Sequence, residues 1–271
     1  MQITRFLSTL ALSAAWISTT TADAEFQQVR KRTAADHSKR DTDAPEKYFH
    51  ESTFAEKALP YEEQKNALKN LVQTYLTTFS DLGIETWLMH GSLLGWWWGQ
   101  KILPWDTDID VQVTEASIHY LAAYYNMTTF FYKTPRFPEG RDYLLEVNPH
   151  YMNRDQTDKL NVIDARWIDM ESGMFIDITS VRYNLTDPAG EGMLSSKDGH
   201  EFRDTYLYPL HSTTFEGVPA RIPYKYEDML EAEYGAQALN NKLYHNHVFK
   251  DDVMEWMPRF ADGSNGNPVE L

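Results

Sequence analysis

The clearest periodic pattern in the chain runs from residue 61 to residue 82, where apolar side chains recur three and four positions apart. This spacing places them on one face of a helix, and Gly83 follows as a stop signal. The apolar stripe consists of Leu68, Leu71, Val72, Tyr75, Leu76, Phe79 and Leu82. We therefore predict an amphipathic helix over residues 61–82 whose stripe belongs to the core.

Shorter patterns predict that strands and helices alternate along the rest of the chain. A second helix, capped by Thr114, is expected to follow the aspartate-rich stretch, and a late helix starts near Pro223 and ends at Gly235. The predicted strands are residues 84–89, 143–147, 161–168 and 174–181, and the predicted helices are residues 114–125 and 223–234. About 210 residues are enough for one α/β or α+β domain with a sizeable core.

The N-terminal part has the pattern of a processed leader. An apolar run follows Arg5 and gives way to small residues that end at Ala24, which predicts a secretory signal peptide over residues 1–24. A retained signal-anchor is the alternative, although about a dozen apolar residues are few for a bilayer span. No stable membrane span is therefore expected after cleavage. Beyond the leader we predict a disordered pro-segment or stem (25–58), the folded domain (59–258) and a C-terminal tail (259–271).

Composition narrows the classes of partner. The formal net charge is −15, and a surface this acidic repels nucleic acid and anionic membranes. The chain has no cysteine, so disulfides cannot stabilise it. The leader, together with glycosylation sequons at Asn126 and Asn184, favours the secretory pathway, either in the Golgi lumen or after secretion.

The candidate chemistry lies in residues 102–113, where Asp106, Asp108 and Asp110 are spaced two apart. If this stretch is extended, the three carboxylates share one face. Carboxylates so close cannot all ionise unaided, and hard oxygen ligands suit Mg²⁺ or Mn²⁺. A capping turn would explain one or two of these aspartates, and a calcium loop of the EF-hand type fails because Val111 and Ser117 occupy its Gly and Glu positions. A divalent metal site is the favoured interpretation.

A Gly-Ser pair precedes these aspartates. Gly91 and Ser92 follow the short strand and open an apolar run, so backbone amides and the Ser92 hydroxyl are expected at a helix N-terminus. Alone, the pair is an ordinary turn and cap. Together with the aspartates it predicts a seat for a phosphate group.

These two blocks resemble the LicD-type phosphotransferases of the nucleotidyltransferase-like superfamily, which include fukutin-related protein and the fungal mannosylphosphorylation proteins. The family pattern Gly-(Ser/Thr)-Leu-Leu-Gly stands at residues 91–95, and Pro-Trp-Asp-x-Asp-x-Asp stands at residues 104–110. Residues 166–169, 173–179 and 215–219 resemble the fungal branch. The resemblance covers about residues 61–235, and it implies an α+β, polymerase-beta-type mixed sheet flanked by helices.

A further metal ligand should come from a neighbouring strand, because a phosphoryl-transfer site with two ions draws ligands from more than one element. Asp177 is our candidate, since it lies between Ile176 and Ile178, whose side chains point to the opposite face. An edge-strand aspartate that faces water is the alternative. Asp169 is assigned to a turn. His245 and His247 are interpreted as a surface pair, because no third ligand accompanies them.

One departure from the family pattern affects donor binding. Many relatives carry Arg shortly after Leu-Leu-Gly, where this chain has three tryptophans, residues 96–98, and then Lys101. The donor phosphate is expected to bind Lys101, Arg166 or Arg182, unless the tryptophans form a stacking wall for a base or sugar. Alternatively, two of the three tryptophans are simply core. The substrate-binding candidates are Gly91, Ser92, Lys101, Trp105 and Arg166.

The resemblance implies transfer of a sugar 1-phosphate. Asp108, Asp110 and Asp177 are the expected ligands of Mg²⁺ or Mn²⁺, and Asp106 is the candidate general base. The fungal motifs and the leader favour mannose 1-phosphate, moved from a GDP-mannose-like donor onto a glycan hydroxyl to form a phosphodiester. A phosphocholine transferase, a conventional Asp-x-Asp glycosyltransferase and a non-catalytic regulator of a partner transferase are the alternatives.

Overall fold

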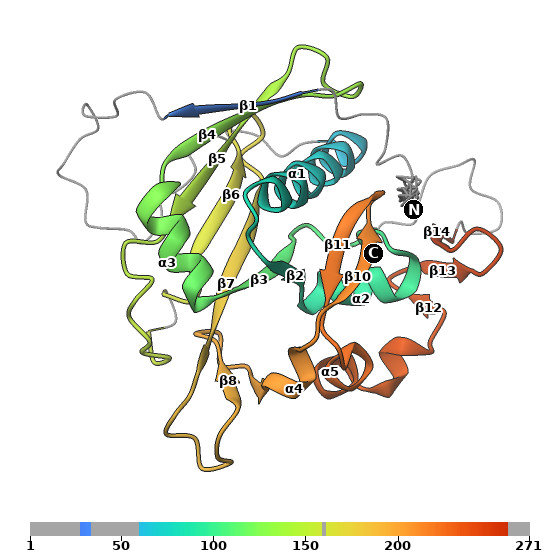
Figure 1. Ribbon diagram of the computed structural model, residues 1–271. Coiled ribbons are helices and arrows are strands. Elements are labelled where there is room, and N and C mark those ends of the chain that lie inside the picture. Colours follow the sequence, from blue (N-terminus) through green and yellow to red (C-terminus); the bar gives the residue numbers. More distant parts are fainter. Residues whose placement is uncertain (1–27, 34–59, 159–160, 260–271) are drawn as a thin grey trace, which may run out of the picture.

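A mixed β-sheet forms the centre of the fold (Figure 1). The computed structural model describes residues 28–33, 60–158 and 161–259. Along the main path the strands are ordered β1-β4-β5-β6-β7-β3-β2, and β8 and β9 extend from β7. The strands are β1 (Gln28–Thr33), β2 (Thr86–Leu88), β3 (Asp110–Thr114), β4 (Thr128–Lys133), β5 (Arg141–Val147), β6 (Ala165–Asp169), β7 (Phe175–Tyr183), β8 (Met193–Ser195) and β9 (Glu201–Arg203). Among the described strands, β3 and β7 are paired in parallel and the other neighbours in this sheet are antiparallel, so the sheet is mixed.

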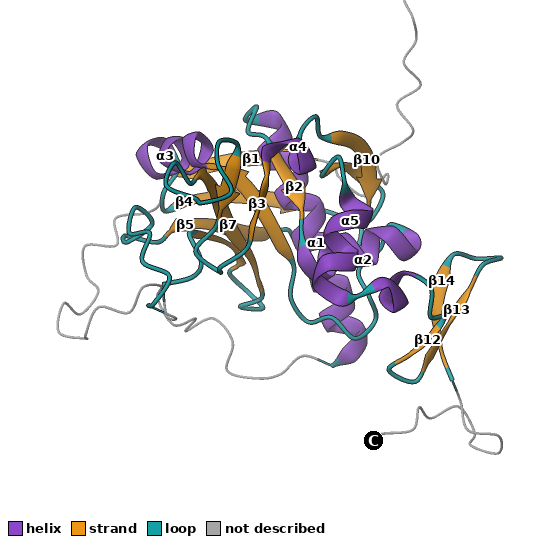
Figure 2. Ribbon diagram, turned by 90° about the horizontal axis from the view of Figure 1, so that it is seen from below, coloured by secondary structure: helices purple, strands orange, loops and turns teal. Residues whose placement is uncertain are grey.

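Helices and two small sheets complete the fold. The helices are α1 (Tyr61–Asp81), α2 (His90–Gly99), α3 (Glu115–Tyr124), α4 (Asp204–Leu207), α5 (Tyr226–Tyr234) and the 3₁₀ helix η1 (Ala236–Leu239). A hairpin joins β10 (His211–Phe215) to β11 (Val218–Ile222), and a three-stranded sheet contains β12 (Leu243–Tyr244), β13 (His247–Lys250) and β14 (Glu255–Pro258). Figure 2 shows that this last sheet projects beyond α2. The expected mixed α+β sheet with flanking helices is confirmed.

The two faces of the sheet have different roles. Register pairs Trp167 with Ile176, and Ile178 with Val111, so these apolar side chains share one face. Helix α1 packs there, since Trp167 Nε1 donates to Thr74 Oγ1 at 3.1 Å. Helix α3 covers the same face. Arg182 lies six positions after Ile176 in β7, so the two side chains point to the same side of the sheet, and Arg182 forms an ion pair with Glu115 of α3. Because the apolar core occupies this face, the alternating polar side chains of β3, β6 and β7 point to the opposite face.

Most predicted elements appear close to their expected positions. The stripe of α1 is buried as predicted, and the hydroxyl of Thr114 accepts from Ser117 N and caps α3. The late helix ends before Gly235, but it begins at Tyr226 and not at Pro223. Strand β4, the β10–β11 hairpin and the β12–β14 sheet were not predicted, because their short runs carry little periodic signal.

The prediction that residues 102–113 form one extended strand is wrong. Only the end of this stretch belongs to β3, which starts at Asp110. Asp106 N donates to Leu103 O at 3.0 Å and closes a turn, with Pro104 at the position after Leu103. Proline presets the dihedral that this turn position needs, so the chain bends before the strand begins.

The N-terminal predictions fall mostly outside the described residues. Residues 28–33, inside the predicted disordered segment, form β1, which pairs antiparallel with β4. Strand pairing there satisfies the backbone groups that an edge strand leaves open. The predicted leader (1–24), the rest of residues 25–58 and most of the predicted tail (259–271) are not among the described residues. Within the part of the chain that is described, no helix is both long and apolar enough to cross a bilayer.

Candidate functional site

A row of charged side chains crosses three strands on the face opposite α1. Asp110 of β3 is in register with Asp177 of the parallel strand β7. Asp177 is in turn in register with Arg166 of β6. Arg166 Nε donates to Asp177 Oδ1 at 2.9 Å, and the guanidinium lies 4.1 Å above the Phe175 ring centre. The sheet therefore brings two predicted metal ligands and one predicted substrate-binding residue together.

The other two aspartates join this row from the loop before β3. The charge of Asp108 raises the pKa values of Asp106, Asp110 and Asp177, and the charge of Asp110 also acts on Asp106, so the four carboxylates lie close to one another. The Asp106 carboxylate also lies against helix α2, because a Cβ added at Gly91 would come within 3.1 Å of Asp106 Oδ2. The predicted aspartates thus converge, but the turn and the loop bring them together and a single strand does not.

Burial dominates the protonation of this cluster, which is defined as Asp106, Asp108, Asp110 and Asp177. Burial, reinforced by the charges of Asp108 and Asp110, raises the pKa of Asp106 to about 7. Burial likewise raises the pKa of Asp110 to about 6, although His90 opposes this shift. Burial also raises the pKa of Asp177, with Arg166 offsetting part of the effect. Crowded carboxylates with raised pKa values form a site that a divalent cation would neutralise.

The donor chemistry of the cluster fits the metal expected from the sequence. Carboxylate oxygens are hard ligands, which Mg²⁺ and Mn²⁺ prefer. Asp110 and Asp177 are held on rigid neighbouring strands, while Asp108 comes from the loop before β3. Together these three could hold a hard divalent ion.

Ser92 links the start of α2 to the first residue of β3. Its Oγ accepts a hydrogen bond from Asp110 N at 3.0 Å, and the side chain is buried. A hydroxyl that accepts one bond still has a proton to donate. Gly91 and Ser92 lie in the first turn of α2, as predicted, where backbone N–H groups have no partner within the helix. The phosphate seat remains a prediction that this geometry allows.

A pocket of about 490 Å³ opens beside Asp106. Asp106 itself lines the pocket, together with two predicted substrate-binding residues, Lys101 and Trp105. Lys101 forms an ion pair with Glu255, and Lys69 lies 4.0 Å from Glu216. Further lining residues are Tyr61, Lys65, Pro104, Thr107 and Trp256. Ammonium groups and aromatic rings beside the aspartates could take a phosphorylated, ring-bearing ligand.

The three tryptophans after Leu-Leu-Gly are packing residues. Their indole N–H groups donate to Thr213 Oγ1 at 2.8 Å, to Leu239 O at 3.3 Å and to Ala238 O at 3.0 Å. These bonds tie α2 to β10 and to η1, so the residues 96–98 do not form a free stacking wall. Trp105, in contrast, lies in a cluster of aromatic rings. Its ring contacts those of Tyr244, His245, His247 and Trp256.

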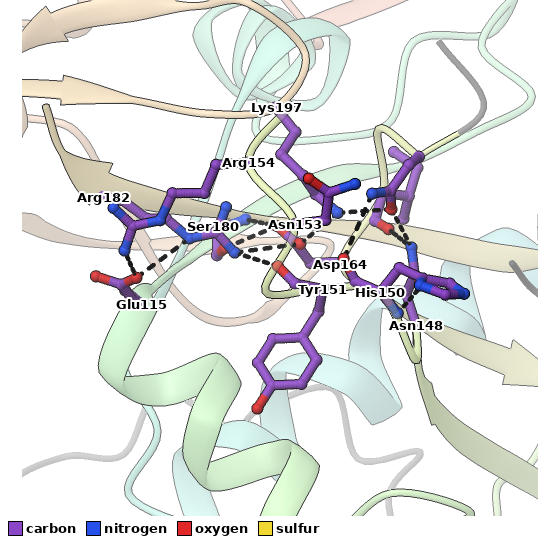
Figure 3. Close-up of polar contacts among 12 residues, drawn as sticks. Glu115, Asn148, His150, Tyr151, Asn153, Arg154, Asp164, Ser180, Arg182 and Lys197 are labelled. Carbon is purple, nitrogen blue, oxygen red and sulfur yellow. Dashed lines mark hydrogen bonds and ion pairs between the residues drawn. The ribbon is translucent and has the colours of Figure 1, made fainter. Parts of the chain in front are cut away.

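The remaining candidates have structural contacts. Asp169 is fully buried, accepts from Ser172 in the predicted turn and pairs with Arg141. Arg182, the third candidate for the donor phosphate, lies in a buried network with Asp164 and Glu115 (Figure 3). It is therefore not placed at the aspartate cluster.

Sequence reasoning missed a second group of titratable side chains beside Asp110. His90 Nδ1 lies 2.8 Å from Glu233 Oε1, and His90 Nε2 lies 3.4 Å from Asp198 Oδ2. Burial opposes a charge on His90, but the bonds to Asp198 and Glu233 outweigh it and raise the pKa of the imidazole to about 10. The position of His90 directly before Gly91 was a usable signal. Its partners come from more than 100 residues further along the chain, where no local pattern marks them.

The mixed sheet carries a carboxylate cluster beside the N-terminus of α2, and this arrangement agrees with a nucleotidyltransferase domain. The family described as "LicD/FKTN/FKRP, nucleotidyltransferase domain" matches residues 83–225, which is more than half of the chain. The chain therefore belongs to the LicD/FKTN/FKRP family.

Relatives of two kinds are similar to this chain. "Mannosyltransferase regulator 4" of Saccharomyces cerevisiae is 30% identical over 169 residues, which cover 62% of this chain and 14% of the relative. "Mannosyltransferase regulator 14" of the same yeast is 35% identical over 114 residues, or 42% of this chain and 12% of the relative. The human "Ribitol-5-phosphate transferase FKTN" is 23% identical over 174 residues, or 63% of this chain and 33% of the relative. The chain thus matches a third or less of each relative's length.

Proposed function

We propose that this protein is a metal-dependent phosphosugar transferase. It moves a sugar 1-phosphate, namely mannose 1-phosphate from a GDP-mannose-like donor, onto a glycan hydroxyl to form a phosphodiester. The observation that carries this proposal is the carboxylate cluster beside a pocket lined by lysines and aromatic rings. Transferase activity within the family, to which FKTN belongs, supports it.

Asp108, Asp110 and Asp177 would hold one or two Mg²⁺ or Mn²⁺ ions. Bound there, the metal neutralises the charge of the donor diphosphate and of the transition state. Arg166 orients Asp177 through its 2.9 Å hydrogen bond and adds positive charge on the same face. A positively charged guanidinium beside the reacting phosphate stabilises charge that develops during transfer.

Asp106 is the proposed general base. Burial raises its pKa to about 7 in the metal-free site, and a bound cation would lower this pKa and favour the ionised form that accepts a proton. The acceptor hydroxyl oxygen attacks the phosphorus attached to the sugar and forms a new P–O bond. The P–O bond to the nucleoside monophosphate breaks, and the hydroxyl proton passes to an Asp106 carboxylate oxygen. Sugar phosphate and acceptor are then joined by a phosphodiester, and the nucleoside monophosphate leaves.

The donor is assigned to the pocket beside Asp106. Lys65, Lys69 and Lys101 line it, and the last two can exchange Glu216 and Glu255 for phosphate oxygens. Trp105 offers a ring face for the base, with Gly91 and Ser92 holding the phosphate next to the metal. The acceptor glycan approaches from the open face of the sheet. The predicted leader supports a site of action in the secretory pathway, in the Golgi lumen or after secretion.

A second candidate function is regulation of a partner transferase. Two yeast relatives carry the name mannosyltransferase regulator, and the chain has tryptophan where many family members have arginine. Ribitol phosphate and phosphocholine are the alternative groups for transfer, the former suggested by FKTN. The intact carboxylate cluster favours a catalytic role over a regulatory one.

The test is incubation of the purified full chain with Mn²⁺, GDP-mannose and a mannose oligosaccharide, followed by mass spectrometry. An Asp108→Ala, Asp110→Ala double variant removes the metal ligands. An Asp155→Ala, Asp228→Ala double variant, with exposed aspartates outside the cluster, is the matched control. We expect a hexose-phosphate increment with the wild type and this control, and none with the ligand variant.

Other products of this incubation would support the alternative functions. A plain hexose increment identifies a glycosyltransferase and overturns the phosphosugar proposal. A phosphocholine or ribitol-phosphate increment with CDP-choline or CDP-ribitol changes the donor but keeps the phosphotransfer site. No product with any of these donors, combined with stimulation of a separate mannosylphosphate transferase, establishes the regulator.

A further inference from the structure

Beside the carboxylate cluster lies a group of four side chains with mixed nitrogen and oxygen donors, which we call the histidine cluster. It consists of His90, Asp198, His200 and Glu233. One donor atom each from His90, His200 and Glu233 lies within 4.8 Å of the others. The three residues come from the start of α2, the turn before β9 and the end of α5. Such convergence from separate elements is typical of a binding site.

The contacts within the histidine cluster indicate which donor atoms face one another. Asp198 Oδ2 lies 3.4 Å from His90 Nε2, and Asp198 Oδ1 lies 3.1 Å from His200 Nδ1. The second contact has the distance of an ion pair but lacks the direction of a hydrogen bond. His90 Nδ1 faces Glu233 Oε1 at 2.8 Å, and the two imidazole rings are 4.5 Å apart. Since Asp198 contacts Nε2 of His90 and Nδ1 of His200, a shared ion would bind the other nitrogen of each ring and Glu233, and would replace the contact between His90 Nδ1 and Glu233 Oε1.

A carboxylate behind a metal-binding imidazole is the usual outer-shell partner, because it fixes the tautomer and the ring orientation. A metal ion that binds here displaces the proton of His90. Two carboxylates with two neutral imidazoles then carry a formal charge of −2, which one divalent cation balances. Nitrogen and oxygen donors together favour zinc-class ions, whereas Mg²⁺ prefers oxygen alone. The histidine cluster therefore differs in chemistry from the all-carboxylate cluster next to it.

Burial and support also suit a metal site. The His90 and Glu233 side chains are 13% and 22% exposed, whereas His200 is 43% exposed and leaves a route for an ion. The turn that carries Asp198 and His200 follows Lys197, a buried residue whose Nζ lies 2.9 Å from Asp164 Oδ1 (Figure 3). Asp164 in turn accepts from the Ser180 backbone and hydroxyl. A ligand-bearing turn anchored in this way is preorganised.

We propose that His90, His200 and Glu233 bind a divalent transition metal of the zinc class, with Asp198 as the residue that orients both imidazoles. Three protein ligands leave one position of a four-coordinate ion open for water or substrate. The site lies next to Asp110, because the charge of Asp110 acts on His90 and the charge of Glu233 acts on Asp110. The proposal does not depend on the phosphotransfer reaction, since binding of the ion is measured directly.

The test uses the untagged full chain, stripped of metal with a chelator and titrated with Co²⁺ and Zn²⁺. We expect one equivalent of Co²⁺ to give the visible absorption of a four-coordinate ion. His200→Ala and Glu233→Gln should each abolish this signal or weaken binding at least tenfold. Asp198→Asn should weaken it by roughly 10- to 100-fold, as expected for an outer-shell partner. His211→Ala, an exposed histidine that stacks on Tyr224, should leave the signal unchanged.

The Asp108→Ala, Asp110→Ala variant separates the two sites, because it should keep the Co²⁺ signal while it loses any phosphotransfer. Equal Zn²⁺ stoichiometry for the wild type, His200→Ala and Glu233→Gln would overturn the proposal. The same holds if the Co²⁺ signal disappears in the aspartate variant but persists in both histidine-cluster variants.

Discussion

Arg166 and Asp177 face each other on the neighbouring antiparallel strands β6 and β7, joined by a 2.9 Å hydrogen bond from Nε to Oδ1. The guanidinium counteracts the effect of burial on the Asp177 pKa. It therefore favours the ionised form of a proposed metal ligand, although burial still raises the pKa of Asp177 overall. One ion pair thus connects the scaffold to the proposed chemistry.

Replacing Arg166 should therefore impair transfer more than stability. We expect Arg166→Met to lower kcat/KM by roughly 100-fold, the scale of losing one charge-stabilising group. Arg166→Lys should retain more activity, although its ammonium cannot reproduce the planar fork. Without the guanidinium the Asp177 pKa rises further, so the acid limb of the pH–rate profile should move to higher pH.

The control is Arg221→Met, which removes an exposed arginine that pairs with Glu85 at 3.2 Å. This variant should keep wild-type kinetics. Wild-type kcat/KM for Arg166→Met, measured by mass spectrometry of the phosphodiester product, would exclude a role of Arg166 in transfer.

Crowding of the aspartates should make the metal-free protein less stable as the pH rises. Burial and neighbouring charge raise the pKa of Asp106 from 3.8 to about 7 and that of Asp110 from 3.8 to about 6. A carboxyl with a higher pKa in the folded state binds its proton more tightly there. Its contribution to stability is complete below about pH 4, and it is lost as the pH rises through 6 and 7.

Asp106→Asn removes one of these titrations and should raise the melting temperature at pH 8 in a chelator by roughly 3 °C. The difference from the wild type should shrink towards zero at pH 4. Added Mn²⁺ should stabilise the wild type at pH 8, where the ligands are ionised. Calorimetry across this range checks the prediction, with exposed Asp228→Asn as the control. A lower melting temperature for Asp106→Asn at pH 8 contradicts it.

The two glycines of the Gly-Ser-Leu-Leu-Gly motif should tolerate alanine differently. A Cβ at Gly95 would lie 2.5 Å from the backbone oxygen of Lys101, so the turn that leads to Asp106 has to move. A Cβ at Gly91 would lie 3.1 Å from an Asp106 side-chain oxygen, which can rotate away. We expect Gly95→Ala to cost about 2 kcal/mol of unfolding free energy, and Gly91→Ala less than about 1 kcal/mol.

Gly91→Ala should nevertheless lower transfer, because the displaced carboxylate is the proposed base. Urea unfolding gives the two stabilities, and product formation gives the activities. If both substitutions lower the free energy of unfolding equally, the backbone near Gly95 can shift to accept a Cβ, and the predicted difference between the two glycines is wrong.

The buried ion pair of Lys197 should be essential for stability. Its side chain is 1% exposed and pairs with the fully buried Asp164. Removing one partner leaves a buried charge with less compensation, so Lys197→Met should cost about 3 kcal/mol. Lys242→Met removes an exposed lysine that pairs with Asp251 at 2.6 Å, and should change the free energy by less than about 1 kcal/mol. Similar urea midpoints for the two variants would show that Arg182 alone compensates Asp164.

Local pattern accounts for much of the fold. The apolar stripe of α1 and the capping threonine of α3 are periodic or positional signals that neighbouring residues set by themselves. The same holds for Asp177, since alternation along one strand places it on the face opposite Ile176 and Ile178. These predictions are confirmed because each local preference matches the burial or the strand register of the folded domain.

The candidate site was only partly predictable. The motif residues predicted the carboxylate chemistry, yet the strand expected over residues 102–113 begins only at Asp110, after a turn at Pro104. Whether a lysine or an arginine faces the donor also depended on contacts across the sheet, which placed Arg166 at Asp177 and Arg182 in a buried network.

The sequence by itself determined the types of the main elements, the motif and the carboxylate chemistry, because periodicity, capping and residue spacing act over a few positions. Only the tertiary structure decided that Asp110, Asp177 and Arg166 stand in one row and that Asp198, His200 and Glu233 meet His90. Strand register and helix packing bring these side chains together. Both depend on the burial of apolar surface across the whole domain, which no short stretch of the sequence encodes.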